Sequence, residues 1–341
     1  MNLKYSLVLV ALLGFARAEA AVSRVFVVNT KGASVSLVDL AAQKEIHRIS
    51  VGEKPYGIAL TRDGKVMAVG VEGEQKIKFY DTGTFKLKGE TRVGPMQSDH
   101  IVLSQDGRHI LVASYFSDAV VGIDIGKMKE EFRLKGLSAP HVVKYGPLKR
   151  NAYVTCKKTT GIGIIDPASR KVVAFHPLNV NPRSLTFSPD ESKLYFGSFW
   201  VDGFFEMDAA SGKVTRLLHQ DPPKENTAPQ EVTYHGVESV GGGTVLAANE
   251  GRSYVDAVDL STGKLLDRLT DVSKPCCIEK VPSSEGEATR VLVSNVGDGT
   301  LRLVEVSTEG KLKLLGKVAV GEAPKRVAFM PETSESKQPS E

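Results

Sequence analysis

The chain has 341 residues, of which 41% are hydrophobic and 25% charged, so it can bury a large core. Forty-four basic residues against 40 acidic ones leave a net charge of +4, too small for the concentrated positive surface that binds nucleic acid. Only three cysteines are present, and two of them are adjacent, which excludes a framework of several disulfides and a zinc site built from paired Cys-x-x-Cys motifs.

The first 20 residues have the features of an export signal. Lys4 precedes an apolar run from Tyr5 to Leu13, and small residues flank Arg17 and Glu19 at a spacing that signal peptidases accept. The alternative, an anchoring helix, would need about 20 apolar residues. We therefore expect residues 1–20 to be a secretory signal peptide. The mature protein is expected to be periplasmic or secreted, with no insertion in the membrane.

An acidic residue that closes a β-prone segment recurs along the chain, with separations of 42, 43, 42, 42, 51 and 46 residues. The seven positions are Asp39, Asp81, Asp124, Asp166, Asp208, Asp259 and Glu305. A lysine follows each of them five or six positions later. We expect the acidic side chains to accept hydrogen bonds from the turns that they open, and the lysines to begin exposed outer strands.

Each repeat also contains a short run rich in β-branched residues before its acidic position, at 25–29, 66–70, 110–114, 152–156, 194–198, 245–249 and 291–295. Such runs are too short for helices. Turn sequences such as Asp63-Gly64 and Asp106-Gly107 lie between repeats and are typical of tight hairpins. Seven repeats of four short strands predict an all-β fold, a seven-bladed β-propeller of four-stranded antiparallel blades.

Several segments resemble the YVTN-type β-propeller repeat, and the resemblance extends from about Val25 to Met330. They are Tyr153-Val154-Thr155-Cys156, Val28-Asn29-Thr30, Val51-Gly52-Glu53-Lys54-Pro55 and Ser188-Pro189-Asp190. Similar propellers occur in surface-layer proteins, in lactonases and in the haem-binding domains of nitrite reductases and related maturation proteins. The resemblance therefore implies a fold and leaves several functions open.

The resemblance also implies how the ring closes, because it makes the run after each proline the innermost strand. Residues 25–29 would then be a second strand, and Pro324–Met330 would supply the missing inner strand of the same blade. We accordingly expect a propeller domain at 21–331 and a flexible polar tail at 332–341. A closed ring leaves no strand edge that demands a partner, so we expect a monomer.

The first positions of the inner strands carry varied chemistry, whereas a purely structural repeat would favour one residue type. The aligned residues are Tyr56, Asp99, His141, Arg183, His235, Cys276 and Lys325. We expect their side chains to be solvated at one mouth of the central channel, where they would bind a small molecule, a cofactor or a partner protein. An idle, water-filled channel is the alternative. Deeper in the channel, Lys144, Glu238 and Glu279 would need partners, water or ligand.

Cys276 and Cys277 follow Pro275 at this mouth. In an oxidising compartment such a pair can close a vicinal disulfide, which we expect here, whereas Cys156 should remain a thiol. Two loops are expected on the same face, the insertion 220–230 and the segment with Phe199 and Trp200, although Trp200 could serve loop packing instead of a ligand.

No nucleophile or phosphate-binding motif is present, and no His-x-His or His-Glu-x-x-His spacing predicts a metal site. Two function classes remain. The first is an exported propeller without catalytic activity that binds a ligand at the mouth. The second is a propeller enzyme, either a lactonase-like hydrolase or a haem-dependent or haem-maturation protein with His141 or His235 as axial ligand. The cofactor is left unassigned.

Overall fold

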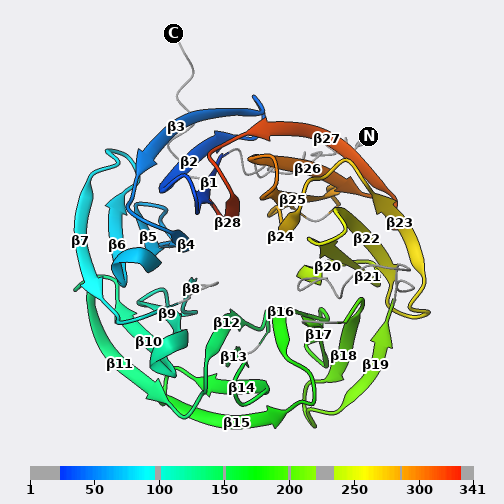
Figure 1. The fold of residues 1–341 in the computed structure, drawn as a ribbon, viewed down its shortest axis with the longest axis horizontal. Helices are drawn as coiled ribbons and strands as arrows, with labels where there is room; N and C mark the ends of the chain where they lie inside the picture. Colours follow the sequence, from blue (N-terminus) through cyan, green and yellow to red (C-terminus); the bar gives the residue numbers. More distant parts are fainter. Residues whose placement is uncertain are drawn as a thin grey trace, which may run out of the picture.

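The computed structural model describes residues 24–96, 101–148, 151–198, 201–219, 234–284 and 286–331. These residues form seven four-stranded antiparallel sheets arranged as the blades of a ring (Figure 1). The predicted fold class is therefore confirmed. Among the described residues, no helix combines the length and the hydrophobicity that a membrane crossing requires.

The strands fall into four concentric sets. The innermost strands are β4 (Pro55–Leu60), β8 (Ile101–Leu103), β12 (Pro140–Tyr145), β16 (Pro182–Phe187), β20 (Tyr234–Gly241), β24 (Pro275–Lys280) and β28 (Pro324–Phe329). The second strands are β5 (Val66–Val71), β9 (His109–Ser114), β13 (Ala152–Cys156), β17 (Lys193–Ser198), β21 (Thr244–Asn249), β25 (Thr289–Asn295) and β1 (Arg24–Asn29).

The third strands are β6 (Lys76–Asp81), β10 (Ala119–Asp124), β14 (Gly161–Asp166), β18 (Phe204–Asp208), β22 (Tyr254–Asp259), β26 (Thr300–Val306) and β2 (Ser34–Asp39). The outermost strands are β7 (Leu87–Arg92), β11 (Lys129–Lys135), β15 (Lys171–Pro177), β19 (Val214–Leu218), β23 (Leu265–Leu269), β27 (Leu312–Ala319) and β3 (Lys44–Ser50). Two single-turn 3-10 helices, η1 (Glu72–Glu74) and η2 (Tyr115–Ser117), follow β5 and β9.

The two ends of the described chain share one blade. Strand β28 pairs antiparallel with β1, with Val27 opposite Val327, and the Thr30 amide donates a hydrogen bond to the Ala323 carbonyl at 3.0 Å. Figure 1 shows the red C-terminal strand seated inside the blue N-terminal strands. The predicted closure of the ring is therefore confirmed.

The repeated acidic residues hold the turns between third and outer strands. Asp39 Oδ1 accepts a hydrogen bond from the Ala42 amide at 2.8 Å, Asp81 Oδ1 accepts one from Thr84 at 2.8 Å, and Asp259 Oδ1 accepts one from Ser261 at 2.7 Å. An Asp in this position satisfies amides that the turn leaves without a backbone partner. The predicted role in the turns is therefore confirmed for the six aspartates.

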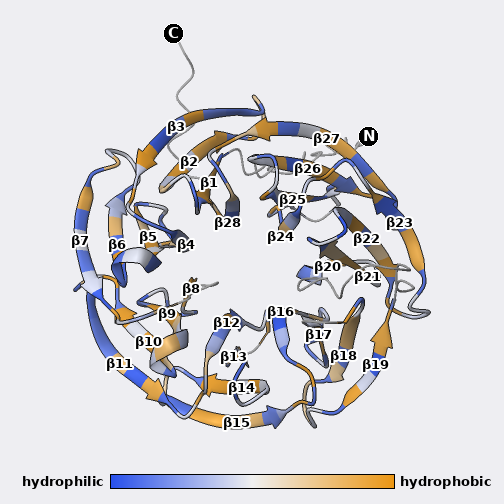
Figure 2. Cartoon of the chain, viewed as in Figure 1, coloured by the Kyte–Doolittle hydropathy of each residue, from blue (hydrophilic) through white to orange (hydrophobic). Residues whose placement is uncertain are grey.

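The core lies between neighbouring blades. Phe26 of β1 packs in one buried cluster with Met67 of β5, and Val25 of β1 packs in another with Leu301 of β26. Both faces of the second strands are therefore covered, which explains their continuous apolar runs. Figure 2 shows polar and apolar residues alternating along the outer strands, as expected where one face meets solvent.

Candidate functional site

The predicted alignment of the inner strands is reproduced residue by residue. Six of the aligned residues each occupy the second position of an inner strand: Tyr56 (β4), His141 (β12), Arg183 (β16), His235 (β20), Cys276 (β24) and Lys325 (β28). Asp99, Phe199, Trp200 and the insertion 220–230 lie outside the described residues.

A recurrent turn leads the chain into four of these strands. The residue before the opening proline has a left-handed backbone at Lys54 (φ 50°), Ala139 (φ 50°), Lys274 (φ 46°) and Ala323 (φ 54°). A left-handed residue other than glycine costs on the order of 1–3 kcal/mol, so its surroundings must hold it. The carbonyls of Lys54, Ala139 and Lys274 accept hydrogen bonds from amides beyond the next strand, at 3.0, 3.1 and 3.2 Å. These turns fix the direction of the mouth residues.

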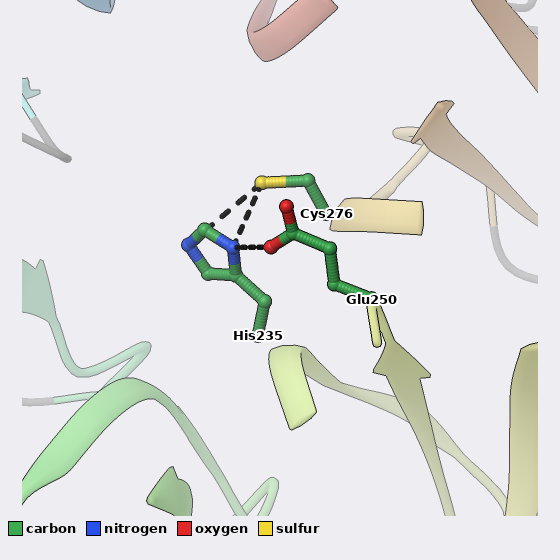
Figure 3. Close-up of side chains that lie close together, drawn as sticks. All are labelled: His235, Glu250 and Cys276. Carbon is green, nitrogen blue, oxygen red and sulfur yellow. Dashed lines mark hydrogen bonds and ion pairs between the residues drawn. The ribbon is translucent and has the colours of Figure 1, made fainter. Parts of the chain in front are cut away.

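Three side chains from neighbouring segments converge at the mouth (Figure 3). His235 Nδ1 lies 2.8 Å from Glu250 Oε2 and 3.0 Å from Cys276 Sγ. Glu250 lies in the turn between β21 and β22, directly after the strand that pairs with β20. A carboxylate and a thiol therefore both contact one imidazole, and the three donor atoms lie within 4.8 Å of one another.

Two further mouth residues extend this cluster. Lys325 Nζ donates to Cys276 Sγ at 3.2 Å and lies 5.5 Å from the centre of the Tyr56 ring, within the range of a cation–π interaction. Inner strands β4, β20, β24 and β28 thus bring Tyr56, His235, Cys276 and Lys325 together. Arg183 interacts electrostatically with the same group of residues, because the charge of its guanidinium helps to lower the pKa of Glu250.

The cations of the mouth stabilise its anions. Burial raises the pKa of Glu250, but the hydrogen bond with His235 and the charges of His235, Lys325 and Arg183 lower it to about 2. Burial also raises the pKa of Cys276, but the hydrogen bond with Cys277 and the charges of His235 and Lys325 hold it well below its usual range.

Four of the six described mouth residues are buried, so the expectation that they are solvated is wrong for these four, whereas Tyr56 and Lys325 are half-buried. His141, Arg183, His235 and Cys276 expose 3%, 6%, 2% and 0% of their surface. One reason is that the inner strands contact one another directly, as where the Ser184 hydroxyl donates to the His235 carbonyl and accepts from the Val237 amide at 3.1 Å. The chemistry of the mouth is therefore held by protein packing.

The predicted vicinal disulfide is not formed in the structure. None of the three cysteines forms a disulfide and all three are buried; the Cys276 and Cys277 sulfurs lie 3.3 Å apart, against about 2.05 Å in a disulfide. The physical reason is that Cys276 Sγ is engaged by His235 Nδ1 and by Lys325 Nζ. Cys156 is a thiol, as expected.

A second layer of charge lies further along the inner strands and is paired within the protein. Lys144 Nζ lies 2.7 Å from Glu238 Oε2, and Arg326 Nη1 lies 3.4 Å from Glu279 Oε1. The expectation that Lys144, Glu238 and Glu279 need partners is thus confirmed. Arg326 was not identified from the sequence, because it occupies a position where five of the other six repeats carry small or apolar residues.

Glu250 was also missed by sequence reasoning, although a signal for it exists. The alignment considered only inner-strand positions, whereas Glu250 follows a second strand. The segment with Phe199 and Trp200, which is expected on the mouth face, also follows a second strand, and Glu250 is an acidic residue at the equivalent place in the blade that carries His235.

Comparisons with known proteins agree on the architecture. No family model matches the chain. A seven-bladed beta-propeller protein of Mycobacterium tuberculosis, Rv1057, is 30% identical over 118 residues, which span 33% of this chain and only 29% of that relative.

Two solved structures resemble the whole ring at low sequence identity. The hydrazine synthase of Kuenenia stuttgartiensis matches with a TM-score of 0.69 and 17% identity over 86% of this chain and 92% of that one. The dihydro-heme d1 dehydrogenase NirN, solved in complex with DHE, matches with a TM-score of 0.61 and 18% identity over 91% and 76%. Strand order and comparisons together show that this chain is a seven-bladed β-propeller.

Proposed function

We propose that this chain is an exported, monomeric propeller that binds a small carboxylate-bearing molecule at the mouth of its central channel. One observation carries the proposal. The pKa of the Glu250 carboxylate is lowered by the charges of Arg183, His235 and Lys325, which come from three different inner strands. Cations gathered around one carboxylate of the protein can bind a carboxylate of a ligand in the same way.

The two layers of the channel support this assignment. In the second layer, Lys144 pairs with Glu238 and Arg326 pairs with Glu279, so its charges are balanced internally. In the mouth layer, cations and ionisable groups of several types lie together on rigid strands. A planar guanidinium such as that of Arg183 is well suited to bidentate recognition of a carboxylate.

Tetrapyrroles are the first ligand class to test. The name of one structural neighbour contains heme d1, and that protein was solved with DHE bound. Haem carries two carboxylates, and its iron accepts imidazole ligands. Because His141 and His235 are both buried at inner-strand entries, a haem-dependent or haem-maturation enzyme is the second candidate function.

Titration of the reduced protein with iron-free protoporphyrin IX and with ferric haem tests the proposal. Each of Arg183→Met and Lys325→Met should weaken the binding of both compounds by about tenfold or more, because each removes a charge-assisted hydrogen bond. Lys88→Met, which removes a lysine charge from outer strand β7, is the matched control.

The two porphyrins separate the two candidates. Tight binding of both compounds that depends on Arg183 and Lys325 supports recognition through carboxylates. Binding of haem alone, abolished by His141→Ala or His235→Ala, would favour the haem enzyme. The proposal fails for this ligand class if neither compound binds, or if the mouth variants and Lys88→Met behave alike.

A further inference from the structure

We propose that His235, Glu250 and Cys276 form a binding site for a divalent, thiophilic metal ion, with Zn²⁺ as the best fit. Each residue offers one donor atom, and the three atoms lie within 4.8 Å of one another. The donors come from β20, from β24 and from the turn after β21, so the fold itself brings them together (Figure 3).

The donor set identifies the class of metal. Mg²⁺ and Ca²⁺ prefer oxygen ligands, so a thiolate disfavours them. Zn²⁺ is bound by cysteine sulfur, histidine nitrogen and carboxylate oxygen, usually in tetrahedral geometry. Three protein donors would leave the fourth position for water or a ligand, which is the pattern of zinc sites that act on small molecules.

The hydrogen bonding of the cluster supports a shared ion. Glu250 Oε2 at 2.8 Å and Cys276 Sγ at 3.0 Å both approach the same ring nitrogen, His235 Nδ1. One nitrogen carries at most one hydrogen, so two anion-forming groups compete for it. A metal ion would take a lone pair from each of the three atoms and displace that proton.

The positions of the donors are held by their surroundings. Cys276 and His235 expose 0% and 2% of their surface. The backbone carbonyl of His235 accepts a hydrogen bond from Ser184 of β16, and β20 pairs with β21, which places Glu250. Ligands supported in this way bind a metal with little rearrangement.

The other group of possible donors in the described part of the chain is a weaker candidate. His109, Asp124 and Glu131 also lie close together. However, Arg108 pairs with Asp124 at 3.1 Å, and Arg170 pairs with Glu131 at 2.9 Å. Both carboxylates already have an arginine partner, and the group contains no sulfur donor.

Substitution of Lys325 tests the metal site separately from the proposed binding of a carboxylate ligand. Its ammonium lies 3.2 Å from Cys276 Sγ and therefore competes with a metal for the sulfur. Lys325→Met should tighten metal binding by about tenfold, because it removes a neighbouring positive charge. The same substitution should weaken porphyrin binding, so the two proposals predict opposite changes.

Anaerobic titration of the reduced, metal-free protein with Co²⁺ tests the site, because Co²⁺ replaces Zn²⁺ and reports sulfur ligation by a near-ultraviolet charge-transfer band. We expect one equivalent of Co²⁺ to bind and Zn²⁺ to displace it. Cys276→Ser should abolish the band, and Glu250→Gln should weaken Co²⁺ binding at least about tenfold. Cys277→Ser and Cys156→Ala should retain the band, and circular dichroism verifies folding of each variant.

Absence of a charge-transfer band in the native protein, or its persistence in Cys276→Ser, would overturn the metal site. Equal Co²⁺ affinity of the native protein and folded Glu250→Gln would remove Glu250 from it. If Co²⁺ binds as expected and neither porphyrin does, the metal site stands and the proposed carboxylate ligand falls. If a porphyrin binds and Co²⁺ does not, the metal site is overturned and the proposed binding of a carboxylate ligand stands.

Discussion

Glu206 provides a stability test close to the blade that carries His235. Its carboxylate is 2% exposed on β18 and pairs with Lys193 at 3.1 Å and with Arg216 on β19. Arg216 also donates to the Leu260 and Ser261 carbonyls of the next blade, at 2.6 and 3.1 Å. Glu206 thus orients an arginine that joins two neighbouring blades.

The size of the effect follows from the pKa of Glu206. Burial raises this pKa, but hydrogen bonds from Arg216, Thr215 and Lys193 lower it from 4.5 to about 2. Such a lowering corresponds to about 3 kcal/mol in favour of the folded state at neutral pH. Because the folded-state pKa is depressed, this stabilisation is complete above about pH 4.5 and is lost as the pH falls through about 2.

We therefore expect Glu206→Gln to lower the free energy of unfolding by about 2–3 kcal/mol at pH 7. Urea unfolding measured at several pH values should show the difference from the native protein shrinking toward zero near pH 2. Glu130→Gln, which removes an exposed ion pair with Arg133, should cost less than about 1 kcal/mol. A difference for Glu206→Gln that stays constant with pH would show that the ionised carboxylate of Glu206 does not stabilise the fold.

Three further predictions test the fold and its thiols. A chain ending before Pro324 should lose cooperative unfolding, because β1 would lose its inner partner strand β28. Removal of residues 332–341 should have little effect on unfolding. Calorimetric transitions at the same temperature in both truncated chains would contradict this. Burial raises the pKa of Cys156 to about 12, so this thiol should resist iodoacetamide in the native protein at pH 8 and react only after unfolding. Mass spectrometry can count the alkylated cysteines in each state. Lys54→Gly should stabilise the protein by up to about 1 kcal/mol, since glycine accepts the left-handed backbone, and a lowered melting temperature would argue against strain in that turn.

The architecture could be predicted from the sequence because it depends on local, repeated signals. The spacing of residues such as Asp81 and Asp124 reflects a turn that the blades repeat, and the proline that opens most inner strands fixes their phase. Phase alone was sufficient to place Tyr56, His235 and Lys325 at one mouth.

The contacts within the mouth could not be predicted, because they depend on distances between side chains that lie on different strands or on different blades. Nothing in the local sequence of Glu250 shows that its carboxylate reaches His235, 15 residues earlier in the chain. Burial was misjudged for the same reason, since a polar residue such as Arg183 at a strand entry gives no measure of how closely the next blade packs. The sulfur of Cys276 accepts a hydrogen bond from Lys325, which is 49 residues away in the chain, so its contacts could not be read from the neighbouring sequence.

Hydrogen exchange with and without protoporphyrin IX tests most directly whether the mouth is a binding site. We expect slower amide exchange upon binding in Arg183–Ser184, Gly236–Val237 and Lys325–Arg326, at the entries of β16, β20 and β28. Outer strands such as β7 and β15 should be unchanged. Protection confined to outer strands, or identical exchange with and without a porphyrin shown to be bound, would contradict a binding site at the channel mouth.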